Sequence, residues 1–157
     1  MVVCLIVVLS RRGPDRPLVV AANRDEKLER AALTATVLHS SAPRVLGGRD
    51  LLAGGTWLAV NEHGVVAGLT NRPSAAGRDP TKRSRGELPL ALATHPTAAA
   101  AVEDFVERFS PEDFNLAWLL VGDRTSLYYS ILASEWPEAK RRLEESLKRP
   151  WDGRPAA

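Results

Sequence analysis

The sequence has little cysteine: Cys4 is the only one among 157 residues. A single thiol cannot form an intramolecular disulfide, so we expect a reducing compartment, the cytoplasm, and a fold that needs no disulfide. The chain also lacks an apolar run long enough to cross a membrane. The apolar opening, residues 1–9, has no basic residue before it and is followed by Arg11 and Arg12. We therefore predict a strand there rather than a signal peptide, and no membrane span.

Aromatic residues are sparse as well, at 6% of the chain, and the net charge is only +2. One local run of cations consists of Arg78, Lys82, Arg83 and Arg85. It has no interleaved aromatic side chains on which bases would stack, so we expect no nucleic acid as a partner. We interpret this run as a solvated loop or at most an anion-binding edge. We predict no metal site. We also predict no phosphate cofactor, because the glycine-rich segment 47–55 lacks the spacing of a nucleotide-phosphate loop.

The chain length predicts one domain, which we place at residues 1–149, followed by a frayed tail at residues 150–157. A hydrophobic content of 45% and a charged content of 25% are typical of a globular protein. Apolar residues at helical spacing predict one helix over residues 85–93 and a second that begins at Thr97. A third helical pattern begins at Ser134.

Three antiparallel hairpins are predicted from pairs of apolar runs with turn residues between them: residues 2–9 with 18–22, 56–60 with 65–70, and 115–121 with 126–132. Together with the helices they predict an α+β protein with antiparallel sheets and packed helices. We expect the strands of the first hairpin to be largely buried. Residues 27–46 show no sustained period and are expected to be mostly loop. Four glycines within residues 47–55 suit close approach by a ligand or by another strand.

Four polar residues follow the predicted strand 18–22 at once: Asn23, Arg24, Asp25 and Glu26. Antiparallel pairing in the first hairpin brings Cys4 close to Arg24 and Asp25. Asn71 ends the strand after residue 65 as Asn23 ends the earlier one, and both amides are able to donate to a developing oxyanion. A simpler interpretation also stands: the tetrapeptide is a turn followed by the first turn of a helix, and Cys4 is a small buried hydrophobe.

Five motifs follow one another over roughly residues 1–125: a cysteine near the start, Asn23–Glu26, Gly54–Leu58, Thr70–Arg72 and Ser84–Leu88. In this order they resemble the transport-and-Golgi-organisation 2 family, also called the NRDE family. The family is similar in its opening to the amino-terminal nucleophile (Ntn) hydrolases. The resemblance therefore implies a layered sandwich of the Ntn-hydrolase type. Haem or lipid handling has been proposed for members.

The resemblance implies a cysteine hydrolase-like site that acts on the C–N amide bond of a small molecule, with Cys4 as the nucleophile. Arg24 would hold the thiolate, Asp25 would orient the freed amine, and Asn71 would donate to the oxyanion. The substrate-binding residues that we infer are Asn23, Gly54, Gly55, Thr56, Trp57 and Arg85.

The alternative function is a non-catalytic carrier or chaperone of haem or another hydrophobic ligand, bound in the same cleft. Trp57 and the glycine-rich run would line a flat apolar slot. Haem would need an axial ligand, and the candidates are Cys4, His39, His63, His95 and Met1. None of them belongs to a haem motif, so we expect haem only as a ligand under this alternative, and no resident cofactor otherwise.

Two features depart from the family pattern. In the family the cysteine directly follows the initiator methionine, whereas Val2 and Val3 intervene here. Cys4 therefore has an amide where the mechanism needs a free amine, unless three residues are removed. Family members also commonly continue past the strand after residue 126 with a segment that contains another asparagine, which has no counterpart here. We expect an incomplete sandwich, shortened in its C-terminal part.

Overall fold

The computed structural model describes residues 4–13, 15–75 and 77–132, together with Arg141 and Glu145. The tail predicted at residues 150–157 lies outside these ranges. The helix predicted from Ser134 also lies outside them, apart from Arg141 and Glu145.

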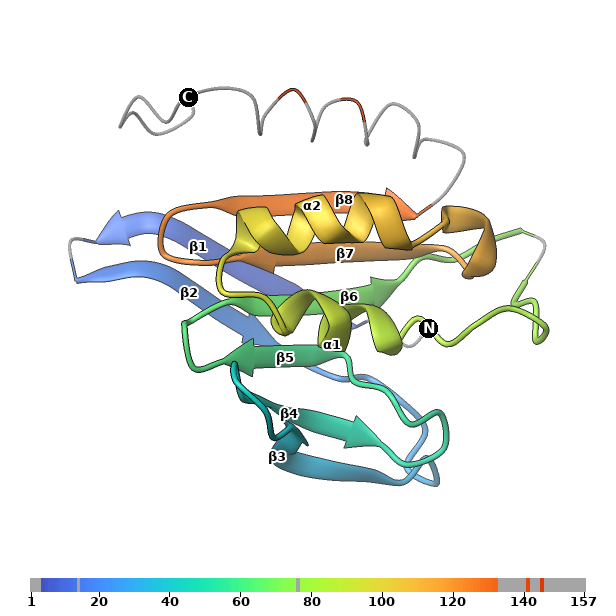
Figure 1. Cartoon of the computed structure of the whole chain (residues 1–157). Coiled ribbons are helices and arrows are strands. Elements are labelled where there is room, and N and C mark those ends of the chain that lie inside the picture. Colours follow the sequence, from blue (N-terminus) through green and yellow to red (C-terminus); the bar gives the residue numbers. More distant parts are fainter. Residues whose placement is uncertain (1–3, 14, 76, 133–140, 142–144, 146–157) are drawn as a thin grey trace.

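The protein is an α+β sandwich, as the sequence predicts, with two antiparallel sheets and two α-helices in the described residues (Figure 1). A two-stranded sheet is formed by β1 (Ile6–Gly13) and β2 (Arg16–Ala22). A six-stranded sheet contains, in spatial as in chain order, β3 (Ala32–His39), β4 (Val45–Asp50), β5 (Leu58–Asn61), β6 (Val66–Asn71), β7 (Ala117–Gly122) and β8 (Leu127–Leu132). Between β6 and β7 the chain forms α1 (Glu87–Ala93), α2 (Ala98–Arg108) and a short 3-10 helix (Pro111–Asp113).

Both α-helices cover one face of the six-stranded sheet, where the hydrophobic core lies (Figure 1). Ala67 and Leu69 of β6 point to this face because strand residues alternate between faces. They pack with Leu88 of α1 and Phe105 of α2, all of them buried. Full burial of a leucine or phenylalanine side chain contributes about 1.5–3 kcal/mol, so this face supplies most of the apolar stabilisation.

The hairpin of β1 and β2 lies on the opposite face of the sheet. Gly68 of β6 points toward it, and a Cβ atom added there would lie 3.0 Å from Ile6 Cδ1. The hairpin is not largely buried, contrary to the sequence prediction. Its period of two leaves alternate residues outward, so that Val7 is 44% and Leu9 47% exposed.

Residues 27–46 are not mostly loop: they contain all of β3 and the start of β4. β3 pairs antiparallel with β4, for example Thr36 with Gly47. The strand was missed because it lies at the sheet edge, where five of its eight residues are exposed and few apolar side chains mark a period.

The glycines of β4 and the following turn permit close backbone approach, as the sequence predicts. A Cβ atom on Gly47 would lie 2.4 Å from the Leu58 carbonyl oxygen, and one on Gly48 would lie 2.3 Å from the Trp57 ring. Gly48 therefore makes room for the indole of Trp57. This packing positions Trp57 at the site described next.

Candidate functional site

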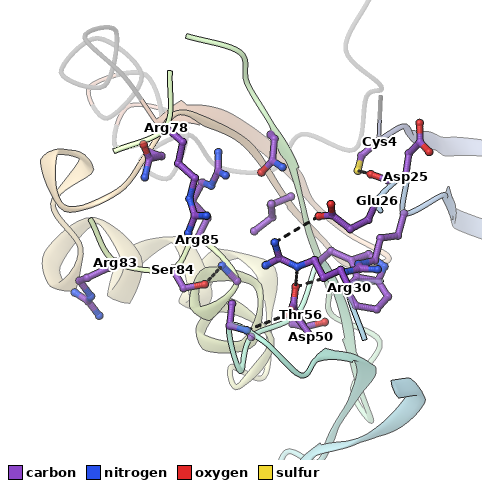
Figure 2. A pocket seen from close by; sticks show the side chains of 18 residues that line it. Cys4, Asp25, Glu26, Arg30, Asp50, Thr56, Arg78, Arg83, Ser84 and Arg85 are labelled. Carbon is purple, nitrogen blue, oxygen red and sulfur yellow. Dashed lines mark hydrogen bonds and ion pairs between the residues drawn. The ribbon is translucent and has the colours of Figure 1, made fainter. Parts of the chain in front are cut away.

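A pocket of about 200 Å³ lies where the ends of β2, β4 and β6 meet the loop before α1. All five sequence motifs contribute to its lining (Figure 2). Of the ten predicted site residues, eight line it: Cys4, Arg24, Asp25, Asn71, Gly55, Thr56, Trp57 and Arg85. The remaining two, Asn23 and Gly54, lie beside it and hold its walls.

Cys4 is partly buried and is positioned by the chain around it. Its thiol donates to the Asp25 carbonyl oxygen at 3.5 Å. The next residue, Leu5, donates its N–H to Asn23 Oδ1 at 2.6 Å and accepts from Asn23 N–H at 3.0 Å. Asn23 therefore fixes the segment that carries Cys4 against the start of the polar tetrapeptide.

Arg24 lies in the pocket wall, and its guanidinium contacts two residues, Asp50 and Trp57. It forms an ion pair with Asp50, at 3.5 Å between Nη2 and Oδ2, and its Cζ lies 4.8 Å from the Trp57 ring centroid. The stacking is a cation–π interaction on a half-buried indole. Within the described residues Arg24 makes no hydrogen bond to the Cys4 thiol, so its side chain connects the polar tetrapeptide to the segment around Trp57.

Asp50, at the end of β4, holds this wall together through its hydrogen bonds and ion pairs. Its Oδ1 accepts the N–H groups of Leu52 and Ala53, both at 3.0 Å, and its Oδ2 accepts Arg30 Nε at 2.7 Å. Burial raises the pKa of Asp50, but the hydrogen bonds from Ala53 and Arg30 and the charge of Arg30 outweigh burial and hold it below 3.8. The carboxylate is therefore charged at neutral pH and holds two guanidinium groups.

Gly55 and Gly86 meet with no side chain between them. A Cβ atom on Gly55 would lie 2.5 Å from the Gly86 carbonyl carbon, and the Thr56 N–H donates to the Gly86 oxygen at 2.9 Å. Gly54 supports the same corner, with φ of +76° and its N–H on the Asp50 carbonyl oxygen at 2.8 Å. Two motifs that are thirty residues apart in the chain therefore form one continuous wall.

Asn71 ends β6, and its exposed side chain lines the pocket. Its amide has no hydrogen-bond partner within the part of the chain that the structure describes. A second asparagine in the lining, Asn115, is occupied: it donates to the Asp79 carbonyl oxygen and accepts the Asp79 N–H, both at 2.8 Å. Only Asn71 of this pair has its amide available for a ligand.

Arg85 and Arg78 form the side of the pocket away from Cys4 and Asp25 (Figure 2). Arg85 is partly buried and donates from Nη1 to the Leu116 carbonyl oxygen at 2.7 Å. Arg78 is exposed, and no hydrogen bond or ion pair joins it to another described residue. This side of the pocket is therefore positively charged.

Ten lining residues were not among the predicted site residues, although Glu26, Ser84 and Gly86 belong to the sequence motifs and Arg78 and Arg83 to the run of cations. The ten are Glu26, Arg30, Asp50, Ala53, Leu69, Arg78, Arg83, Ser84, Gly86 and Asn115. Asp50 carried a signal, since it stands four residues before the glycine pair Gly54 and Gly55 and opens a turn. Asn115 carried none, because its role depends on the loop at Asp79 folding back to it.

The described residues hold no group of three or more histidine, cysteine, aspartate or glutamate side chains arranged for a metal ion. Among the same residues, no helix combines the length and the apolar character that crossing a membrane requires.

The fold and the pocket define an α+β sandwich protein with a thiol, an available amide and several guanidinium groups around one small cavity. The chain matches the family model described as Transport and Golgi organisation 2 over residues 3–147. It therefore belongs to the Transport and Golgi organisation 2 family, which confirms the resemblance found in the sequence.

One relative in this family is the Transport and Golgi organization 2 homolog of Mus musculus. It is 38% identical to this chain over 74 residues, a segment that covers 45% of the chain and 26% of the mouse protein. The aligned segment thus spans about a quarter of the relative's length.

Proposed function

We propose that the pocket is an Ntn-type cysteine hydrolase site that cleaves the C–N amide bond of a small molecule. One observation carries the proposal: the Cys4 thiol and the available Asn71 amide line the same cavity. Acyl transfer requires a nucleophile that reaches the carbonyl carbon and a donor that stabilises the oxyanion, and these two residues supply both kinds of group.

The proposed reaction begins at the amino terminus. Removal of the residues before Cys4 exposes its α-amine, which takes the thiol proton, and the adjacent Asp25 orients that amine. The sulfur attacks the amide carbonyl carbon. The carbonyl oxygen then gains negative charge, which the Asn71 Nδ2–H groups stabilise by donating hydrogen bonds to it. The C–N bond then breaks, the amine product leaves with the proton from the α-ammonium, and water hydrolyses the thioester to the acid and free Cys4.

Arg24 supports this site by position. Its ion pair with Asp50 and its stacking on Trp57 hold the tetrapeptide that lies against Cys4. Asn23 is a positioning residue of the same kind, through its two hydrogen bonds to Leu5.

The competing function is carriage of haem or another hydrophobic ligand without turnover. Of the axial-ligand candidates within the described residues, only Cys4 lines the pocket, while His39, His63 and His95 do not. The many charged side chains of the lining favour a polar ligand over a wholly apolar one.

The test measures hydrolysis of a panel of N-acyl 4-nitroanilides by the wild type and by Cys4→Ala and Cys4→Ser. We expect both variants to lose turnover by at least about a thousandfold while ligand binding persists. The mass of the amino terminus shows whether Cys4 is the first residue of the active protein. Thermal midpoints serve as the folding control, because Cys4 is partly buried and its replacement can change stability.

Ser10→Ala, a change in β1 outside the pocket, is the matched control and retains turnover. Undiminished hydrolysis by folded Cys4→Ala would sink the nucleophile assignment. A haem absorption spectrum that changes with Cys4→Ala, in protein without amidase activity, would favour the carrier.

A further inference from the structure

The charges around the pocket do not balance. Its lining contains five arginines and three carboxylates: Arg24, Arg30, Arg78, Arg83 and Arg85 against Asp25, Glu26 and Asp50. An unbalanced cation in a cavity is informative because a guanidinium away from water is normally paired.

Three of the arginines have carboxylate partners. Arg24 and Arg30 bind Asp50, and Arg30 also lies 3.7 Å from Glu26. Arg83 binds Glu87 at 2.7 Å, and in Figure 2 its side chain lies apart from the other arginines. Their charges are therefore neutralised within the protein.

Arg85 and Arg78 have no such partner. Arg85 donates to the neutral Leu116 carbonyl oxygen and forms no ion pair with any described residue, and neither does Arg78. A guanidinium has five N–H donors, so the bond to Leu116 leaves most of those of Arg85 available. Both side chains lie on one side of the pocket, across from Cys4 (Figure 2).

The surroundings of Arg85 also indicate that its positive charge is not compensated within the described residues. Burial lowers the pKa of Arg85 from its usual range, and the positive charges of Arg78 and Arg30 lower it further. The cation is therefore less favourable there than in water, although it stays protonated at neutral pH. An anion in contact with it would relieve both the burial and the repulsion.

We propose that the substrate carries an anionic group, a carboxylate or a phosphate, which binds Arg85 and Arg78 while its amide carbonyl lies toward Cys4. As a statement about a substrate, this rests on the hydrolase function proposed above. Bidentate contact with a planar guanidinium suits both oxyanions. The volume of about 200 Å³ is below the roughly 300–1,000 Å³ of pockets for drug-sized ligands, so the substrate class is a small acidic amide.

Three probes share one amide and differ in charge: N-acetylglycine carries a carboxylate, N-acetylphosphoethanolamine a phosphate, and N-acetylglycinamide no charge. Their affinities are measured by calorimetry on Cys4→Ala, which separates binding from turnover. We expect one or both anionic probes to bind at least about tenfold more tightly than the neutral one, as a charge-assisted contact provides. The stronger of the two identifies the anion.

Arg78→Gln is the main variant, because no hydrogen bond or ion pair joins this exposed side chain to another described residue. It should weaken anionic binding about tenfold or less and leave the neutral probe unchanged. Arg85→Gln should remove the preference for charge altogether, and its thermal midpoint reports whether it folds. Arg124→Gln is the matched control: it replaces an exposed arginine in the turn between β7 and β8, outside the pocket.

Equal affinity for charged and neutral probes would overturn the proposal, as would absence of binding by all three. An equal loss in Arg78→Gln and Arg124→Gln would overturn it too, because general attraction to net charge would then explain the binding. Preferential anion binding without hydrolysis by the wild type would contradict the proposed function but leave the anion site standing. Hydrolysis at equal kcat/KM for charged and neutral probes would contradict the anion site and leave the proposed hydrolase function standing.

Discussion

Asp50 and Asp123 are two aspartates with similar local surroundings, but their carboxylates bind different sets of partners. Each ends a strand or follows one, and each accepts backbone N–H groups in a turn. Asp123 takes the N–H of Ala98 at the start of α2 at 2.8 Å, and those of Thr125 and Ser126 at 2.7 and 2.8 Å. Asp50 takes two backbone N–H groups and then two arginines.

The difference between them separates structure from function in this fold. At Asp123 the polar groups satisfy one another, and the carboxylate closes the corner between α2 and the β7–β8 turn. At Asp50 the network continues outward through Arg24 and Arg30 to a cavity where Arg85 has no carboxylate. An incomplete set of partners in a polar network indicates a place for a ligand.

The largest effect on stability is expected from Asp123→Ala. The change leaves the N–H groups of Ala98, Thr125 and Ser126 without their acceptor, which should cost about 2–4 kcal/mol. The thermal midpoint should fall by about 4–16 °C, as measured by circular dichroism. Alkylation of Cys4 by iodoacetamide in the folded variant should keep the wild-type rate, and a change in that rate would mean that the two regions are coupled.

Asp50→Asn is expected to destabilise less, by about 1–3 kcal/mol, because the amide keeps the acceptor oxygen but loses the charge. It also releases Arg24 and Arg30 from their counter-charge. N-Acetylglycine should consequently bind at least as tightly as to the unsubstituted pocket, although the protein is less stable. Calorimetry and urea unfolding measure the two quantities, and weaker binding together with lower stability would mean that the Asp50 carboxylate also holds the pocket in the shape that binds the anion.

Acid should reduce stability through both aspartates, and this is the smallest effect. In the folded protein the pKa of Asp123, like that of Asp50, lies below 3.8: burial raises it, but hydrogen bonds from Thr125, Ala98 and Ser126 outweigh burial. The unfolded chain therefore binds more protons at low pH. The stability from each group is complete above the unfolded pKa and is lost as pH falls through the folded one.

Urea midpoints measured from about pH 5 downward check this expectation. Asp50→Asn and Asp123→Asn should each lose less stability on acidification than the wild type, since each lacks one of these carboxylates. Wild-type slopes in both variants would assign the acid sensitivity to other groups.

Much of the fold is predictable from the sequence because its signals are local. The helix after Thr97 has an N-cap and an apolar stripe, and the Thr97 side chain does accept the Ala100 N–H at 3.1 Å. The turn at Gly64 has the positive φ, +83°, that its sequence predicts. β3 was missed because its pairing with β4, and not its own side chains, makes it a strand.

The geometry of the site, like the fold, is predictable from the sequence only in part. The proximity of Cys4 to Asp25 follows from antiparallel pairing, and the structure places the thiol 3.5 Å from the Asp25 oxygen. The binding of Arg24 to Asp50 could not be predicted, since no pattern in the sequence sets which carboxylate a guanidinium 26 residues away will meet. The resemblance implies that Arg24 holds the thiolate, which stays a prediction, and the structure shows its guanidinium on Asp50 and Trp57.

The contact between Gly55 and Gly86 constrains how the pocket can move. Backbone lies directly on backbone there, and the Thr56 N–H is bonded across it. The segment that carries Trp57 and the loop that carries Arg85 are therefore joined directly through their backbones. Residues 24–30 reach Asp50 through the side chains of Arg24 and Arg30, and backbone bonding resumes at Ala31, whose carbonyl oxygen accepts the Leu51 N–H at 3.1 Å. Displacing residues 24–30 from Asp50 would break two ion pairs, whereas separating Gly55 from Gly86 would break a backbone hydrogen bond and direct backbone packing.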